Sequence, residues 1–444
     1  MSTQDSRSSM RIMRSITKHF AAMTVILVLN GAICLGSQNL AYDTKEIGFI
    51  SPALETEIQN EMINGTIPSL QAGIVLQNRL VWAKDFGSQP SLDTIYTVGS
   101  ITKTFTATAF LQLHEQGQID LDADVSTYLP YIIRNPTYPN TPITIRQLLS
   151  HRAGMIRDAE AWRLYDNSLL TWLNDTLGIN LPLWVDPPPV LNEWINSTST
   201  ANPAMWTSEP GTQYQYSNVG FLFLAYLLEQ ITGQSYAAYI QENIVTPLGL
   251  MNTGFEASSF PNQLASPHES VGGSLLEVPI HDNYYYGAGG LRSTVPDLAQ
   301  YLITHMNQGR SNGVQLLQPE SVELMHTVVS SSYGLGWEYS EIGQGHGGVT
   351  VGFTAEMRYQ ENRLGAYGIV LLINRAANFE DDPDFMLSKA TIIQLLLQEA
   401  GLMFAQSLAS AGQVPLLITL GGLSVGTTVF LVVRWRKGRI VNQH

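Results

Sequence analysis

Strand-like segments lie near both ends of the body of this chain, and helix-like segments fill the middle. The early segment, 70–83, is strand-like on both sides of a polar turn at Gln77-Asn78-Arg79 and predicts a β-hairpin. The late segments predict strands at 333–337, 354–359 and 366–373, with a helix over 385–400 after them. Two strand-rich ends around a helical middle favour one sheet that is built from both ends. We therefore expect one α+β domain over 45–405, with a helical insertion over about 118–285.

A serine and a lysine stand three residues apart, at Ser100 and Lys103, where an apolar run begins. The run has helical spacing and meets no glycine or proline before Gly117, so it predicts a helix over 100–116. Residues i and i+3 share a helix face, which brings the hydroxyl and the amine within reach of each other. An uncharged amine beside a hydroxyl can create a nucleophile. A helix cap and an exposed lysine would explain the same two residues.

Two further segments have the polar residues expected just ahead of helices. Tyr216 and Asn218 precede a strongly apolar run, 219–231, that stops at Gly233, so we expect them on a loop before a buried helix. Thr144 and Gln147 have the spacing of a reciprocal cap, and the helix they begin is expected to continue to residue 151. Between these segments, 156–210 contains five of the eight tryptophans and predicts a helix followed by an irregular loop.

Charge and cysteine content exclude several classes of function. The formal net charge is −14, and the body without the basic ends at 1–40 and 434–444 reaches −21. So acidic a body is not expected to bind nucleic acid, which requires basic patches. The only cysteine is Cys34, and the histidines form no zinc-binding spacing, so we expect neither a metal nor another cofactor.

Both ends of the chain predict export and membrane attachment. Residues 1–40 contain a basic lead and an apolar run, 20–36, which is typical of a signal peptide or an N-terminal anchor. Residues 414–433 are uncharged over a length that can cross a bilayer, and the basic tail 434–444 follows at once. The positive-inside rule places that tail in the cytoplasm. We expect an extracytoplasmic catalytic domain held at the cell membrane by one C-terminal pass.

Taken together, the motifs resemble the serine β-lactamase and penicillin-binding-protein superfamily, and within it the class C β-lactamase-like branch of serine hydrolases. The resemblance covers about residues 50–400 and includes five segments in the expected order. They are 99–130, 144–151, 210–218, 247–251 and 287–293. It implies an antiparallel sheet flanked by helices, with a helical subdomain.

The resemblance also implies roles for particular residues. Ser100 would be the acylated nucleophile, and Lys103 would take its proton. Tyr216 would shuttle protons to the leaving group, and nearby cations would have to lower its pKa for it to act as a base. The substrate-binding set would be Asn218, His346, Gly348 and Val349. The backbone N–H groups of Ser100 and Val349 would form the oxyanion hole.

The third element departs from the pattern of the familiar lactamases, which have Lys-Thr-Gly or Lys-Ser-Gly where this chain has His346-Gly347-Gly348. Histidine is mostly uncharged at pH 7, so a fixed cation for a substrate carboxylate is missing. We therefore expect a small-molecule or peptide substrate with an uncharged end. The main hypothesis is a D-amino-acid-type peptidase or amidase. An esterase, a β-lactamase and a sensor that binds without turnover remain alternatives.

Overall fold

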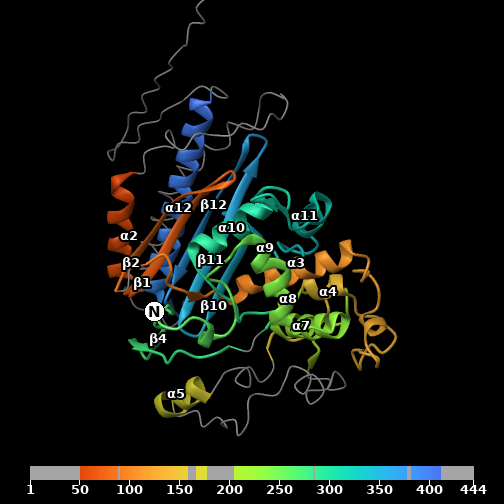
Figure 1. The fold of residues 1–444 in the computed structure, drawn as a ribbon. Coiled ribbons are helices and arrows are strands. Elements are labelled where there is room, and N and C mark those ends of the chain that lie inside the picture. Colours follow the sequence, from red (N-terminus) through yellow and green to blue (C-terminus); the bar gives the residue numbers. More distant parts are fainter. Residues whose placement is uncertain are drawn as a thin grey trace, which may run out of the picture. The chain divides into compact units, whose positions relative to one another are not determined.

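A six-stranded antiparallel sheet forms the centre of the part that the computed structural model describes, residues 51–88, 91–158, 167–177, 205–283, 286–377 and 382–411 (Figure 1). The strand order is β2-β1-β12-β11-β10-β9. The bounds are β1 Ser69–Leu76, β2 Arg79–Gly87, β9 Glu338–Ser340, β10 Gly343–Thr350, β11 Phe353–Asn362 and β12 Gly365–Ile373. The expectation that both ends of the body build one sheet is confirmed, because β1 pairs directly with β12.

Two helices cover one face of the sheet, α2 (Pro52–Asn64) and α12 (Pro383–Ser410). Each has a proline in its first turn and a side-chain cap, from Ser51 in α2 and Asp382 in α12. The predicted final helix is therefore present but extends ten residues past residue 400. Among the described residues, α12 is the one helix long and apolar enough to span a membrane. Half of the most apolar stretch of α12 is buried inside the fold, as in a helix that packs on a core.

Period-two alternation divides the sheet residues between two cores. On β12, Ile369, Leu371 and Ile373 pack with α2 and α12, while Val370 and Leu372 belong to the core on the opposite face. The helix α10 (Val295–Met306) packs on that opposite face. The central strands are consequently buried on both sides.

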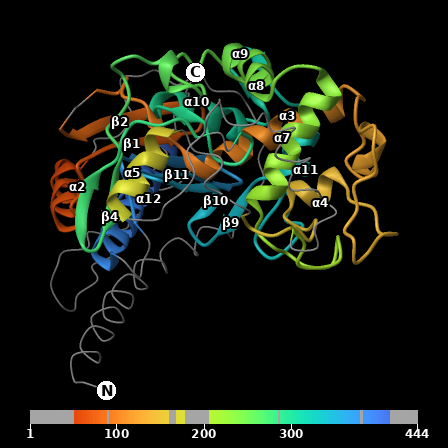
Figure 2. The same ribbon diagram turned by 90° about the horizontal axis from the view of Figure 1, so that it is seen from below.

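A helical subdomain continues this second core, and Figure 2 shows its helices gathered beside the sheet. Its helix α7, Asn218–Thr232, is the predicted buried helix. Ser217 caps it, and Gly233 ends it in the left-handed conformation. The other described helices that have not yet been given are α3 Thr102–Glu115, α4 Ile145–Leu149, α5 Asn167–Leu177, α8 Tyr236–Ile240, α9 Thr246–Leu248 and α11 Pro319–His326, and the second core includes no residue of α5.

Short helical turns and strands complete the described residues. The turns are η2 Gly99–Ile101, η3 Val125–Tyr128, η6 Gln241–Val245 and η7 Ala257–Ser259. The strands are β3 Tyr96–Thr97, β4 His268–Val271, β5 Ser274–Glu277, β6 Arg292–Ser293, β7 Arg310–Ser311, β8 Val314–Gln315 and β13 Arg375–Ala376. The reciprocal cap of Thr144 and Gln147 is present, although its helix α4 ends at Leu149 rather than at 151.

The prediction of a strand over 333–337 is wrong. The segment is a tight turn with isolated bridges at Tyr333, and Gly336 adopts a φ of +74°. Tyr333, Leu335 and Trp337 are all buried, so the alternation that looked like a strand comes from a turn packed between helices. A Cβ at Gly336 would lie 2.6 Å from the Cβ of Ala107, so α3 approaches too closely for a side chain there.

The membrane-related predictions lie outside the described residues. They concern 1–40, the span 414–433 and the tail 434–444. Most of the tryptophan-rich stretch 156–210 also lies outside, apart from α5 and the flanking residues at each end.

A buried histidine, His305, and a partly buried one, His326, link α10 and α11 beside the helix α3. His326 Nε2 lies 3.4 Å from His305 Nδ1, and His305 Nε2 lies 3.5 Å from Thr108 Oγ1. Burial lowers the pKa of His326 to about 4 and that of His305 well below its usual value. Both rings are therefore held uncharged in the folded chain.

We expect the folded state to lose stability between pH 6.5 and 4. An unfolded histidine binds a proton near pH 6.5, but folded His326 does so only near pH 4, so acid favours the unfolded chain. At about 1.4 kcal/mol per pH unit, His326 accounts for about 3 kcal/mol of the lost free energy of unfolding. Urea unfolding between pH 7 and 4 measures this, and His326→Gln should flatten the pH dependence. The matched change at partly exposed His114, His114→Gln, should leave it steep. Equal slopes in all three proteins would contradict the prediction.

Candidate active site

Ser100 and Lys103 lie side by side at the start of the central helix. Ser100 is in the 3₁₀ turn η2, and α3 begins two residues later, so the predicted helix is present with a tighter first turn. Lys103 Nζ lies 2.9 Å from Ser100 Oγ. The lysine side chain is fully buried, while Ser100 keeps part of its surface. The i, i+3 spacing has therefore brought the two groups into contact.

Two oxygen atoms besides that of Ser100 surround the Lys103 amine. Asn218 Oδ1 and the backbone oxygen of Ala288 both lie 2.7 Å from Nζ, and both can only accept hydrogen bonds. Burial lowers the pKa of Lys103 to about 7, against an opposing effect of nearby carboxylates. An uncharged amine fits these contacts, because its two N–H groups serve the two oxygens and its lone pair faces the Ser100 hydroxyl. This arrangement can accept the proton of Ser100.

Tyr216 contacts the same hydroxyl. Its OH donates to Ser100 Oγ at 2.9 Å, and its ring packs on His151 with centroids 4.2 Å apart. Burial raises the pKa of Tyr216, although Lys103 Nζ lies 4.9 Å from its ring centroid and the guanidinium of Arg157 lies 5.3 Å from it. Arg157 does lower this pKa, but burial outweighs its effect, so the nearby cations do not make Tyr216 a base. Tyr216 is a protonated donor, and the group that can accept a proton first is Lys103.

Asn218 is the first residue of α7 rather than a residue on a free loop. Its neighbour Ser217 caps the helix by accepting from the Gly220 N–H, and Ser217 Oγ donates to the Ile156 oxygen. The Ser217 N–H donates to His151 Nδ1 at 3.0 Å. These contacts hold Tyr216 and Asn218 in place, so His151 has a structural position beside the site.

The third element lies on β10 and faces the η2 turn. A Cβ on Gly348 would lie 2.0 Å from the Val98 oxygen and 3.2 Å from the Ser100 nitrogen, so glycine alone allows this approach. The Gly347 N–H points to Glu338 Oε2 on β9, and Val349, two residues on, has the same direction. The N–H groups of Ser100 and Val349 therefore lie on adjacent backbones, in the arrangement expected of an oxyanion hole.

His346 is buried rather than open to a substrate, with 1% of its surface exposed. Its Nδ1 must donate to the Gly347 oxygen, 2.6 Å away, so its Nε2 accepts from the Tyr333 hydroxyl at 2.9 Å. Burial is the main cause that lowers its pKa. The third element therefore supplies no fixed cation, as the sequence indicated, and the ring centroid of its histidine lies 6.4 Å from that of Tyr216.

Two carboxylates beside the site were missed in the sequence. Asp158 Oδ1 accepts from Asn218 Nδ2 at 2.7 Å, and Glu338 Oε1 lies 3.8 Å from His346 Nε2. Arg358 pairs with Glu338 at 2.6 Å, and that cation helps to hold the pKa of Glu338 below its usual value against burial. No local motif marks either residue, since each acts on a partner far away in the sequence.

The guanidinium of Arg292 is held inside the fold. The residue is buried, and its guanidinium donates to the Phe255 and His281 oxygens. Asp297 lies in the first turn of α10, and its backbone N–H donates to the side chain of the capping residue Thr294.

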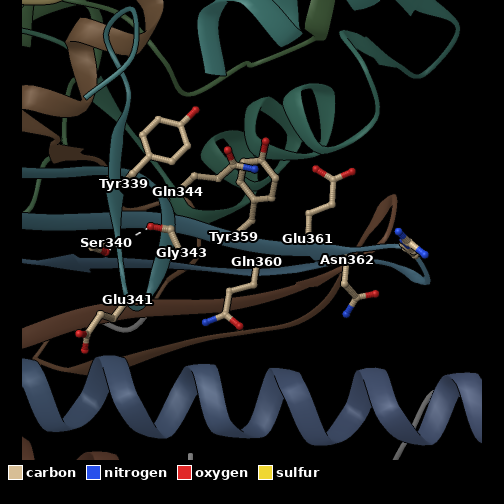
Figure 3. A pocket seen from close by; sticks show the side chains of 10 residues that line it. Tyr339, Ser340, Glu341, Gly343, Gln344, Tyr359, Gln360, Glu361 and Asn362 are labelled. Carbon is tan, nitrogen blue, oxygen red and sulfur yellow. Dashed lines mark hydrogen bonds between the residues drawn. The ribbon is translucent and has the colours of Figure 1, made fainter. Parts of the chain in front are cut away.

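A surface groove lies elsewhere, at the end of the sheet formed by β9, β10 and β11. Figure 3 shows Tyr339, Gln344, Tyr359 and Glu361 pointing to one side of it. None of the site residues predicted from the sequence lines this groove.

Comparisons with known proteins agree with this fold. Residues 54–391 match the Beta-lactamase family. Protein flp of Staphylococcus aureus (strain MRSA252) is 24% identical over 339 residues, which cover 72% of this chain and 62% of that protein. The chain thus spans less than two thirds of this relative. A putative D-alanyl-D-alanine carboxypeptidase of Escherichia coli (strain K12) is 25% identical, covering 63% of this chain and 69% of that protein.

Solved structures show the same architecture. The octameric penicillin-binding protein homologue from Pyrococcus abyssi has a TM-score of 0.62 at 24% identity, covering 81% of each chain. The D-stereospecific amidohydrolase from Streptomyces sp. has a TM-score of 0.57 at 26% identity, covering 74% of this chain and 97% of that one. With a match that spans most of its length and a serine, lysine and tyrosine in mutual contact, the chain belongs to the beta-lactamase family and has the fold of a serine hydrolase.

Proposed function

We propose that this chain is an exported, membrane-tethered serine hydrolase that cleaves amide or ester bonds through an acyl-Ser100 intermediate. The observation that carries the proposal is the double contact at Ser100 Oγ, with Lys103 Nζ and Tyr216 OH each 2.9 Å away. A hydroxyl held between a buried amine and a phenol is arranged for proton transfer. The uncharged segment 414–433 and the basic tail after it support the tether.

In the proposed reaction, Ser100 Oγ attacks the substrate carbonyl carbon and its proton passes to Lys103 Nζ. The oxyanion that forms is held by the N–H groups of Ser100 and Val349. The C–N or C–O bond then breaks, and the leaving group takes a proton from Tyr216, which Lys103 replaces. Water attacks the acyl-serine in the second half, and its proton returns along the same path.

The substrate class that we propose is a D-amino-acid amide or peptide with an uncharged end. Its support comes from the relatives, which include a D-stereospecific amidohydrolase and a putative D-alanyl-D-alanine carboxypeptidase. The buried, uncharged His346 supports an uncharged substrate end, since it offers no cation for a carboxylate. The same observation favours an esterase as the second candidate.

A substrate panel on the full chain in detergent tests this proposal. We expect D-amino-acid p-nitroanilides to be hydrolysed at least about tenfold faster than their L-forms. A site that contacts the substrate at several points binds the transition state of one enantiomer better than that of the other. Nitrocefin should be the slowest substrate. If p-nitrophenyl esters turn over while neither amide enantiomer does, the esterase replaces the amidase. A stable acyl-enzyme without product release would instead favour the sensor.

A further inference from the structure

The side-chain amide of Asn218 lies between a carboxylate and the Lys103 amine. Its Nδ2 donates to Asp158 Oδ1 at 2.7 Å, and its Oδ1 accepts from Lys103 Nζ at the same distance. Asp158, Asn218 and Lys103 thus form a line of hydrogen bonds that ends at Ser100.

The orientation of the Asn218 side-chain amide decides whether it can accept a hydrogen bond from the Lys103 amine. If the amide turned over, its NH₂ group would face the N–H groups of Lys103, and two donors would oppose each other. A carboxylate can only accept, so Asp158 selects the orientation in which the amide oxygen faces Lys103. An amine held on two oxygens then keeps its lone pair toward Ser100.

We propose that Asp158 is a positioning residue of the active site, which orients Asn218 and thereby holds Lys103 against Ser100. This inference rests on the proposed function. The adjacent Arg157 balances the charge of Asp158, because its guanidinium nitrogen lies 3.4 Å from the Asp158 carboxylate, and the same guanidinium lies 5.3 Å from the ring centroid of Tyr216.

The backbone of this loop is anchored independently of the two side chains. The Arg157 oxygen accepts from the Asn218 N–H at 2.8 Å, at the start of α7. The Arg157 side chain is 67% exposed and that of Asp158 is 34% exposed, so neither fills the core. Substitutions at these two positions are therefore expected to keep the fold.

The charges of the two residues act on Lys103 in opposite directions. Burial is the largest influence and lowers the pKa of Lys103, while Asp158 raises it and Arg157 lowers it. Charged or titratable groups face this amine from every surrounding element. They are Asp158 and Arg157 after α4, His151 at the end of α4, Tyr216 before α7, Glu338 on β9 and His346 on β10.

Three variants separate orientation from charge. Asp158→Asn keeps an oxygen that can accept from Asn218 but removes the negative charge, while Asp158→Ala removes both. Arg157→Gln is the matched control on the same loop, because it removes the opposite charge. The readout is the rate of covalent labelling of Ser100 by an uncharged fluorophosphonate between pH 5 and 9, followed by intact mass, with circular dichroism as the check on folding.

We expect the midpoint of the pH–rate curve to move in opposite directions. Loss of the negative charge disfavours the charged amine, so Asp158→Asn should shift the midpoint down by about 0.5 pH unit. Arg157→Gln should shift it up. Asp158→Ala should shift it down and also label about tenfold more slowly than Asp158→Asn at high pH, because the amide loses its acceptor.

Midpoints that move the same way, or stay unchanged, would overturn the inference while leaving the proposed function intact. Wild-type labelling speed in Asp158→Ala would do the same. Absence of any labelling at Ser100 in the wild-type chain would overturn the proposed function, and the inference with it.

Discussion

Ser100→Ala is expected to abolish hydrolysis, with a loss of about 10⁴-fold or more in kcat. Alanine has no oxygen that could hold the acyl group, and both groups that contact this oxygen lose their partner. The fold should persist, since only one hydroxyl is removed from a partly exposed position. Turnover of the best substrate in the panel measures the loss, and a fluorophosphonate should leave the variant without an adduct.

The matched control is Ser340→Ala, a change at an exposed serine in the groove of Figure 3. It should keep the wild-type rate and the wild-type adduct, because Ser340 contacts none of the site residues. A Ser100→Ala variant that hydrolyses its substrate at the wild-type rate would exclude an acyl-serine mechanism at this position.

Lys103→Met is expected to lower kcat/KM by about 10³-fold and to remove the main pH step of the reaction. Methionine has a similar length and can fill the buried space, but it has no lone pair that could take the proton of Ser100. In the wild-type chain the rate should rise with pH through about 7, since Lys103 is a base only when uncharged and its pKa lies about there. The pH–rate profiles of the two proteins are the measurement.

A second lysine serves as the control for this prediction. Burial also lowers the pKa of Lys389, which lies on α12 at the other face of the sheet. Lys389→Met should therefore keep the pH step near 7, whatever it does to the free energy of unfolding. If Lys103→Met kept the step, or Lys389→Met lost it, another group would have to be the base.

The geometry around the third element accounts for the kind of substrate we propose. His346 is locked between the Gly347 oxygen and Tyr333, and Arg358 is paired with Glu338 and Glu356. His346 on β10 is thus uncharged, and Arg358 on β11 is already paired with carboxylates. An uncharged substrate end suits such a wall better than a free carboxylate.

The sequence by itself determined those features that depend on spacing along one element. Ser100 and Lys103 meet because residues three apart share a helix face, and the apolar run ending at Gly233 makes α7 because a buried helix needs such a run. The hairpin of β1 and β2 and the long strands β11 and β12 follow in the same way from short apolar runs bounded by turn residues. The family motifs added the order in which these pieces meet.

Only the tertiary structure decided the features that depend on surroundings. Burial raises the pKa of Tyr216 despite the nearby Arg157, and it holds His346 in contacts with Tyr333 and Gly347 instead of leaving it open to a substrate. The apparent strand at 333–337 is a turn for a similar reason, because its alternating residues are buried by packing on helices. Desolvation and packing arise from atoms contributed by distant segments, and for that reason no local pattern could reveal the contact of Asp158 with Asn218.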